Sequence, residues 1–192
     1  VLMKKILVIL ILIFSLQTPS QADDIRDFQI EGMGIGDSLL DFLSEEDIKK
    51  LKKNYYPKSK KFVRLLNVRK NNELSTYETV HVYVKEKDKK YIIKSINGIL
   101  LFKNNIHECY AKKKEIVNDV SLLANSKGDS YIYNYPNDKS KSDVTNFEFS
   151  DGMFRVWCTD YAKKREKNKA YDHLSVTISS AEYLKFLKHE AR

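Results

Sequence analysis

The chain has 192 residues, of which 42% are hydrophobic, 31% charged and 11% aromatic, with only six Gly, three Pro and two Cys. This composition excludes a disordered, collagen-like, disulfide-dense or multi-span membrane protein. The net charge is +8, from 34 Lys and Arg against 26 Asp and Glu. The length leaves room for one medium-sized domain, or two small ones, with a hydrophobic core.

The first 22 residues have the layout of a secretory signal peptide. Lysines at 4 and 5 precede an apolar run over 6–14, and small residues at 20 and 22 occupy the −3 and −1 positions of a cut before Asp23. The run is about half of the ~20 residues needed to cross a bilayer, so an uncleaved anchor is the weaker interpretation. We expect cleavage between Ala22 and Asp23, and a periplasmic or secreted single α+β domain over 23–192 without a transmembrane segment.

The remaining charge is unevenly distributed. Residues 23–48 carry nine acids and one base, whereas 49–70 carry ten bases and no acid. Ser44, followed by three acids, predicts the start of a helix, and the helix macrodipole favours cations near its end. The cations concerned are Lys49, Lys50, Lys52 and Lys53. A solvated helix explains the pattern, while the alternative is a Lys49–Lys61 block that binds an anionic surface. Nucleic acid is not expected as a partner of an exported chain without a nucleic-acid motif.

The order of hydrophobic patterns predicts an α+β fold, with an antiparallel sheet and helices packed on one face. The expected strands are 28–31, 62–68, 77–85, 90–96, 131–135, 144–149, 153–159 and 173–178. The expected helices are 39–43 with Asp37 as N-cap, 44 to about 53, 105–124, and a last helix capped by Ser179 with Glu182 three residues on. The halves 28–102 and 105–188 each run from helix to strands, which suggests a repeat without residue-level identity.

The two cysteines are expected to form a disulfide. Cys109 lies on the apolar stripe of the 105–124 helix, although Lys113 interrupts that stripe and would extend its amine to solvent. Cys158 shares a strand face with Phe154 and Val156, so both thiols point into the layer between helix and sheet. In an oxidising compartment this predicts a Cys109–Cys158 bridge, with two buried thiols or a metal or redox pair as alternatives.

Motifs for cofactors, metals and catalysis are sparse. Gly32, Gly34 and Gly36 do not complete a dinucleotide-binding pattern, because Asp37 stands where the third glycine is needed. The four histidines show no zinc-ligand spacing. We therefore expect no cofactor and no metal. Asp172 and His173 leave one enzymatic alternative, a small periplasmic hydrolase whose site is assembled from distant residues.

Strand alternation places a set of aromatic and cationic residues on one sheet face. If Val80, Val82 and Val84 face the helices, His81 and Tyr83 share the opposite face, and Arg155 and Trp157 do so by the same argument. Tyr, Trp and Arg are enriched in binding interfaces. A third row, whose facing the sequence leaves open, consists of Tyr131, Tyr133 and Tyr135. The alternative is a set of cross-strand aromatic pairs covered by a loop or by the last helix.

The segment DFxIEGxxIGDSLL over 27–40, with 106–109 and Trp157-Cys158, resembles a family of small uncharacterised bacterial exported proteins. The resemblance spans most of the chain after the leader and implies export, but no activity. The architecture is also similar to β-lactamase-inhibitor-like modules of exported binding and envelope-assembly proteins, and fold alone does not imply function.

These observations favour an exported, non-enzymatic binding module that presents a sheet face to a protein or an envelope component. The candidate binding residues are His81, Tyr83, Arg155 and Trp157, with Lys49, Lys50, Lys52 and Lys53 for an anionic surface. The alternatives are the hydrolase-like enzyme and the anionic-surface binder.

Overall fold

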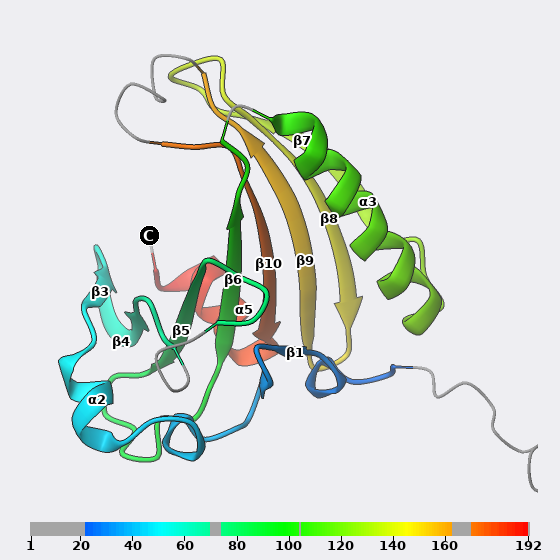
Figure 1. Cartoon of the computed structure of the whole chain (residues 1–192). Coiled ribbons are helices and arrows are strands. Elements are labelled where there is room, and N and C mark those ends of the chain that lie inside the picture. The colour runs from blue at the N-terminus through cyan, green and yellow to red at the C-terminus, as the bar shows by residue number, and fades with distance from the viewer. Residues whose placement is uncertain (1–21, 70–73, 104, 163–169, 192) are drawn as a thin grey trace, which may run out of the picture.

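The computed structural model describes residues 22–69, 74–103, 105–162 and 170–191, and its dominant feature is an eight-stranded antiparallel sheet (Figure 1). The α+β class and the antiparallel sheet are therefore confirmed. The predicted leader lies, apart from Ala22, outside the described residues. None of the helices in the described ranges is long and apolar enough to cross a membrane.

The sheet consists of two meanders joined through their last strands. The first contains β3 (Lys53–Tyr56), β4 (Ser59–Leu65), β5 (Thr79–Lys85) and β6 (Ser95–Leu101). The second contains β7 (Asp129–Asn134), β8 (Lys141–Phe149), β9 (Gly152–Asp160) and β10 (His173–Ser180). The strand order is β3-β4-β5-β6-β10-β9-β8-β7, so β6 pairs with β10 at the centre. A helix precedes each meander, and the main hydrophobic cluster draws residues from both.

The outer face of the sheet, defined by Phe154, Val156 and Cys158 on β9, carries the core. The long helix α3 (Ile106–Leu123) lies against the convex side of the sheet (Figure 1). Asn105 caps the first turn of this helix. The rest of this face is covered by the segment that contains η1 (Ile25–Asp27), β1 (Gln29–Ile30), β2 (Met33–Gly34), η2 (Leu39–Asp41) and α2 (Glu45–Lys50). The Phe28 ring packs there, its centroid 5.2 Å from that of Phe154.

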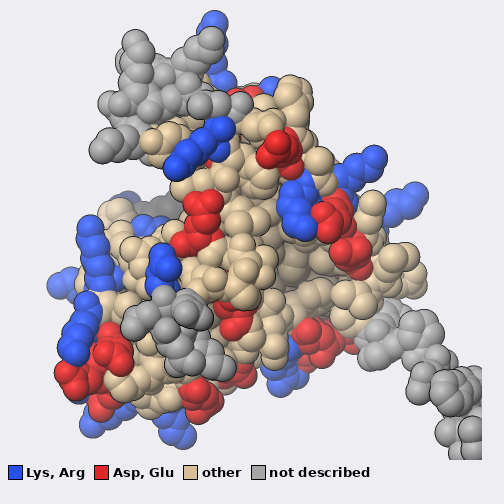
Figure 2. Space-filling model, in the orientation of Figure 1, with Lys and Arg blue, Asp and Glu red and all other residues tan. Residues whose placement is uncertain are grey.

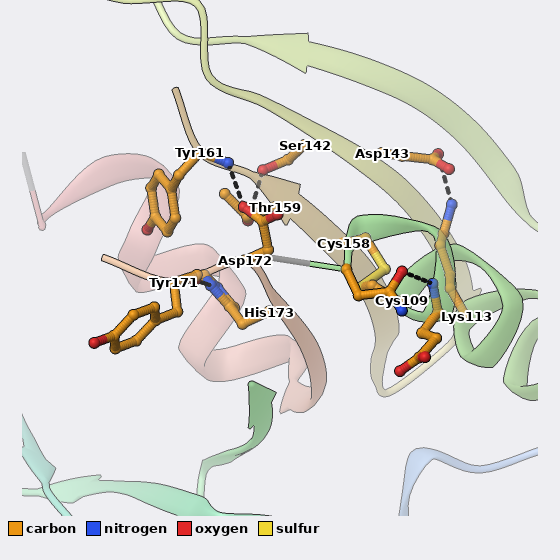
Figure 3. The surroundings of a disulfide bond; sticks show 12 residues. Cys109, Lys113, Ser142, Asp143, Cys158, Thr159, Tyr161, Tyr171, Asp172 and His173 are labelled. Atoms are coloured by element: carbon orange, nitrogen blue, oxygen red, sulfur yellow. Dashed lines mark hydrogen bonds and ion pairs between the residues drawn. A yellow bond between two sulfur atoms is a disulfide. The ribbon is translucent and has the colours of Figure 1, made fainter. Parts of the chain in front are cut away.

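The predicted cysteine pair is present. Cys109 of α3 and Cys158 of β9 are at disulfide-bonding distance, with their Cα atoms 6.0 Å apart (Figure 3). Both residues are fully buried. The bond fixes α3 to a central strand of the sheet.

One turn along α3, Lys113 does not reach solvent as the sequence suggested. Its residue is only 6% exposed, and its Nζ donates to Asp143 Oδ1 of β8 at 2.6 Å (Figure 3). The ammonium is therefore paired with a carboxylate of the sheet and does not extend to solvent. A buried cation next to the disulfide is tolerable because it is paired.

The last helix is on the unexpected side of the sheet. α5 (Ala181–His189) contacts the inner face, defined by Met153, Arg155 and Trp157, whereas all helices were expected on one face. Its N-cap is Ser180, one residue later than predicted, since Ser179 still belongs to β10 and its hydroxyl bonds that of Ser95 at 2.7 Å. Phe186 of α5 packs on Phe62 of β4, with the ring centroids 4.7 Å apart.

Two further predictions about the first meander are wrong. The helix from Ser44 ends at Lys50, and the following residues form β3, which pairs with β4 around a turn at Pro57. Residues 90–94 are not a strand, because Ile93 bonds the backbone of Gly36 and Asp37 instead of continuing the hairpin.

The predicted helix over 39–43 is the 3-10 turn η2, and its cap is Ser38. Asp37 was expected to be that cap, but its carboxylate accepts from the Gly34 amide at 2.7 Å.

Removing the disulfide is expected to lower the free energy of unfolding by about 4 kcal/mol, because the bond closes a long loop of the unfolded chain. Cys109→Ser/Cys158→Ser, compared with wild type in urea, measures this loss. Reduced wild-type protein is the matched control and should unfold at the same urea concentration as the variant. An unchanged midpoint after reduction would contradict the assignment.

Removing Asp143, which accepts the hydrogen bond of the buried Lys113 ammonium, is expected to destabilise the fold. Asp143→Ala leaves the Lys113 ammonium without its carboxylate and should lower the free energy of unfolding by about 2 kcal/mol. The double variant Lys113→Met/Asp143→Ala should recover most of that loss. Asp160→Ala, which removes the carboxylate paired with the more exposed Lys141, is the control and should cost less than about 1 kcal/mol.

Candidate functional site

A polar row crosses the inner face of the sheet. His81, Asn97, Thr177, Arg155 and Asn146 lie in direct register on five adjacent strands, from β5 to β8. Because residues two apart on a strand share a face, the neighbouring positions on either side of this row belong to the same surface. Tyr83 lies two residues from His81, and Trp157 two residues from Arg155. The register thus brings the four predicted sheet residues to one face, as the alternation requires.

Helix α5 covers the end of this face that includes Tyr83. The ring centroids of Tyr83 and Tyr183 are 5.1 Å apart, and the hydroxyls of Tyr56 and Tyr183 are hydrogen-bonded. Burial is the main cause that raises the pKa of all three phenols above the usual value. Tyr83 therefore follows the alternative interpretation, in which the last helix covers the aromatic side chains of this face. Its ring packs within a tyrosine cluster.

Next to α5 the inner face holds two adjoining cavities, and α5 itself helps to line the first of them. The first has a volume of about 290 Å³, and its lining includes Arg64, Asn97, Arg155, Trp157, Thr177 and Tyr183. The second, of about 370 Å³, is lined by Tyr131, Tyr133, Tyr135, Ser142, Arg155 and Trp157 among others. Arg155 and Trp157 line both cavities, so they stand at the junction of one continuous surface. We call this surface the inner groove.

The charge of the inner groove is positive. Arg64 and Arg155 contribute to its lining, and none of the described residues that line the two cavities is acidic. Arg155 Nε donates to Asn146 Oδ1 at 2.7 Å, which holds the guanidinium plane against the sheet. This contact uses only one of the five N–H donors of the side chain.

Two polar atoms of the groove lack partners. Asn97 Oδ1 and Thr177 Oγ1 are buried and have no hydrogen-bond partner among the described residues. Thr177 lies opposite Arg155 in the register, and Asn97 lies opposite Thr177 on the next strand. Buried polar atoms without partners are uncommon and costly, and they gather at functional sites.

The far end of the groove is formed by the third tyrosine row, whose facing the sequence left open. Tyr131 and Tyr133 are 44% and 48% exposed on the edge strand β7, and the Tyr133 and Tyr135 rings meet edge to face at 5.1 Å. The Tyr135 hydroxyl lies 3.3 Å from Ser142 Oγ. Tyr131 and Tyr133 therefore offer exposed rings to anything that enters the groove.

The predicted lysine cluster is divided. Lys49 and Lys50 lie on α2 and pair with Glu45 and Glu46, each at 2.7 Å. The hydrogen bond that Lys49 donates to Glu45 is the largest cause of the raised pKa of Lys49. Lys52 and Lys53 follow the helix, and Lys53 belongs to β3 rather than to the last helical turn.

Acidic side chains stand beside the basic ones around α2 (Figure 2). At the other end of the Lys49–Lys61 block, Lys61 Nζ lies 2.8 Å from Glu190. The surroundings therefore partly neutralise the block, which weakens the case for an anionic surface as its partner.

Asp172 and His173 do not assemble into an acid–base pair. The Asp172 carboxylate accepts from the Tyr161 amide at 2.8 Å, and His173 Nδ1 donates to the Tyr171 carbonyl at 3.2 Å (Figure 3). Neither residue lines the two cavities of the inner groove. The geometry gives the hydrolase alternative no specific support.

Within the described ranges, no three His, Cys, Asp or Glu side chains come close enough together to hold a metal ion. Comparisons with protein families, with curated protein sequences and with solved structures gave no match. The resemblance of the 27–40 segment to exported bacterial proteins stays a prediction.

The two inner-face histidines are expected to titrate below their ordinary pKa of 6.5. Burial lowers the pKa of both imidazoles, with the Arg64 guanidinium as a second cause for His81. Because the folded pKa lies below the unfolded one, their contribution to stability is complete above pH 6.5 and is lost as the pH falls toward the folded values. An NMR titration, assigned with His81→Gln and His173→Gln, measures this, and midpoints at or above 6.5 would contradict it.

Proposed function

We propose that this protein is an exported binding module that holds its partner in the inner groove. The observation that carries the proposal is the groove itself, in which Trp157 and Arg155 join two cavities on a sheet face that α5 covers only in part. Aromatic and arginine side chains supply large contact areas at low entropic cost, and they dominate binding energetics in interfaces.

The shape of the groove supports binding more than catalysis. Its two cavities are open and contiguous, and their lining holds tyrosines, hydroxyls and amides without a carboxylate or histidine among the described residues. A general acid–base mechanism needs a titratable group within hydrogen-bond reach of the reacting atoms. The lining offers contact and hydrogen bonding to a partner, which is the chemistry of recognition.

Export is part of the same proposal. It rests on the leader-like pattern of residues 1–22 and on the Cys109–Cys158 pair, since disulfides persist in oxidising compartments. The partner is then a protein or another component of the envelope or of the extracellular medium.

The proposal is tested by capturing partners from an envelope and secreted fraction with matched baits. Trp157→Ala and Tyr133→Ser should retain at least about five-fold less of the captured material than wild type, because they remove contact surface from the groove. Ile132→Ser is the control, since Ile132 is 54% exposed on the same strand but does not line the groove cavities. It should capture as much as wild type.

Thermal unfolding of each bait separates lost binding from lost folding. Tyr133 is half exposed, so Tyr133→Ser should unfold within a few degrees of wild type. Equal capture by wild type, Tyr133→Ser and Ile132→Ser would overturn the proposal, whatever the stability of Trp157→Ala.

A further inference from the structure

We infer that the inner groove recognises an acidic sugar, with Arg155 holding the carboxylate and Trp157 and the β7 tyrosines contacting the face of the ring. This inference rests on the proposed function and adds the chemical class of the ligand. It follows from three properties of the groove: its charge, its unsatisfied polar atoms, and the mixture of rings and hydroxyls along it.

Charge selects an anion. Arg155 and Arg64 line the groove, and its described lining has no acidic residue to compensate them. Because the contact with Asn146 occupies Arg155 Nε, the terminal N–H groups of the guanidinium remain available to a ligand. A planar guanidinium pairs best with a carboxylate or a phosphate, whose two oxygens match its fork.

The polar atoms beside Arg155 favour a ligand that also carries hydroxyl groups. Asn97 Oδ1 and Thr177 Oγ1 are the acceptors without partners in the same row. Both are closed to solvent in this structure, so a ligand hydroxyl reaches either one only when the side chains over it move aside. A fatty acid, or an aromatic acid without a ring hydroxyl, would bring a carboxylate without any such donor. A sugar acid brings both groups on one ring.

The remaining surface matches the alternating character of a pyranose. Trp157, Tyr131 and Tyr133 offer apolar ring faces or edges. The Tyr135 hydroxyl lies in the same cavity, 3.3 Å from the buried Ser142 hydroxyl, which also bonds Thr159. A sugar ring presents C–H groups on its faces and hydroxyls around its rim, so it can use both kinds of contact at once. The cavity volumes of about 290 and 370 Å³ each accommodate about one such ring.

The groove is also open toward the edge of the sheet. Tyr131 and Tyr133 stand on β7, the last strand in the sheet order, and are about half exposed. A ligand can therefore continue past the edge strand, and an acidic oligosaccharide chain can lie along the two cavities. The same chemistry could come from a free uronic acid or from one residue of a polymer, and the experiment separates these sources.

Trp157 gives a direct readout, because it is the only tryptophan in the chain. Its fluorescence is followed while the protein is titrated with D-galacturonate, the methyl ester of galacturonate, trigalacturonate and 4-hydroxybenzoate. Galacturonate or its trimer should produce a saturable change, and the uncharged ester should bind at least about ten-fold more weakly. Tighter binding of the trimer than of the monomer identifies a polymer as the source.

Variants locate the site. Arg155→Gln should weaken galacturonate binding at least about ten-fold, and Thr177→Val about three-fold, with both variants folded by circular dichroism. Arg69→Gln, which removes an arginine outside the groove cavities, is the matched control and should bind as wild type does. Equal binding of ester and acid, unchanged binding by Arg155→Gln, or a response to 4-hydroxybenzoate alone would overturn the inference.

The failure of this inference is distinguishable from failure of the proposed function. Capture that depends on Tyr133, combined with no response to galacturonate or its trimer, overturns the acidic-sugar assignment and leaves the binding module standing. Equal capture by wild type and by the Tyr133→Ser and Ile132→Ser baits overturns the proposed function, on which the inference rests.

Discussion

The structure depends on the two-faced character of its central strands. β9 and β10 lie in the middle of the sheet, and their side chains alternate between an outer and an inner face, so both faces need cover. The outer face receives α3 and the N-terminal segment, and its residues Phe154, Val156 and Cys158 are buried. Among the described helices, the inner face receives α5, a helix of nine residues. The groove is the part of the inner face that this short helix borders but does not fill.

The attachment of α3 to the outer face explains why the fold is stable although its inner face is only partly covered. A disulfide to β9 and an ion pair from Lys113 to Asp143 on β8 fix the helix across two strands. The hydrophobic cluster under it extends through both meanders. Because the outer face supplies this core, the inner face is free to keep polar residues, whose contribution to folding is small or unfavourable.

Much of this was predictable from local pattern, and the errors have physical causes. The α3 helix, the cysteine pair and the facing of β5 and β9 follow from periodicity, which neighbouring elements reinforce. β3 was missed because its lysines continue a helix-like charge pattern, although Leu51 is already extended. Asn97 was missed because the predicted strand ended at residue 96, whereas β6 continues to Leu101. The side of the sheet on which α5 lies depends on tertiary contacts of Tyr183 and Phe186 with β4 and β5. Tyr56 and Arg64 escaped notice for the same reason.

The polar row itself argues that the groove has a role beyond folding. At the centre of a sheet, Val or Ile at positions 97 and 177 would stabilise the fold without leaving polar atoms unsatisfied. The adjacent outer-face positions, Ile96 and Ile178, have that character and are fully buried. The chain therefore places apolar residues on one side of β6 and β10, and unsatisfied polar ones on the other beside an arginine. Local departures from the most stable choice are expected at functional sites, where a ligand supplies the missing partners.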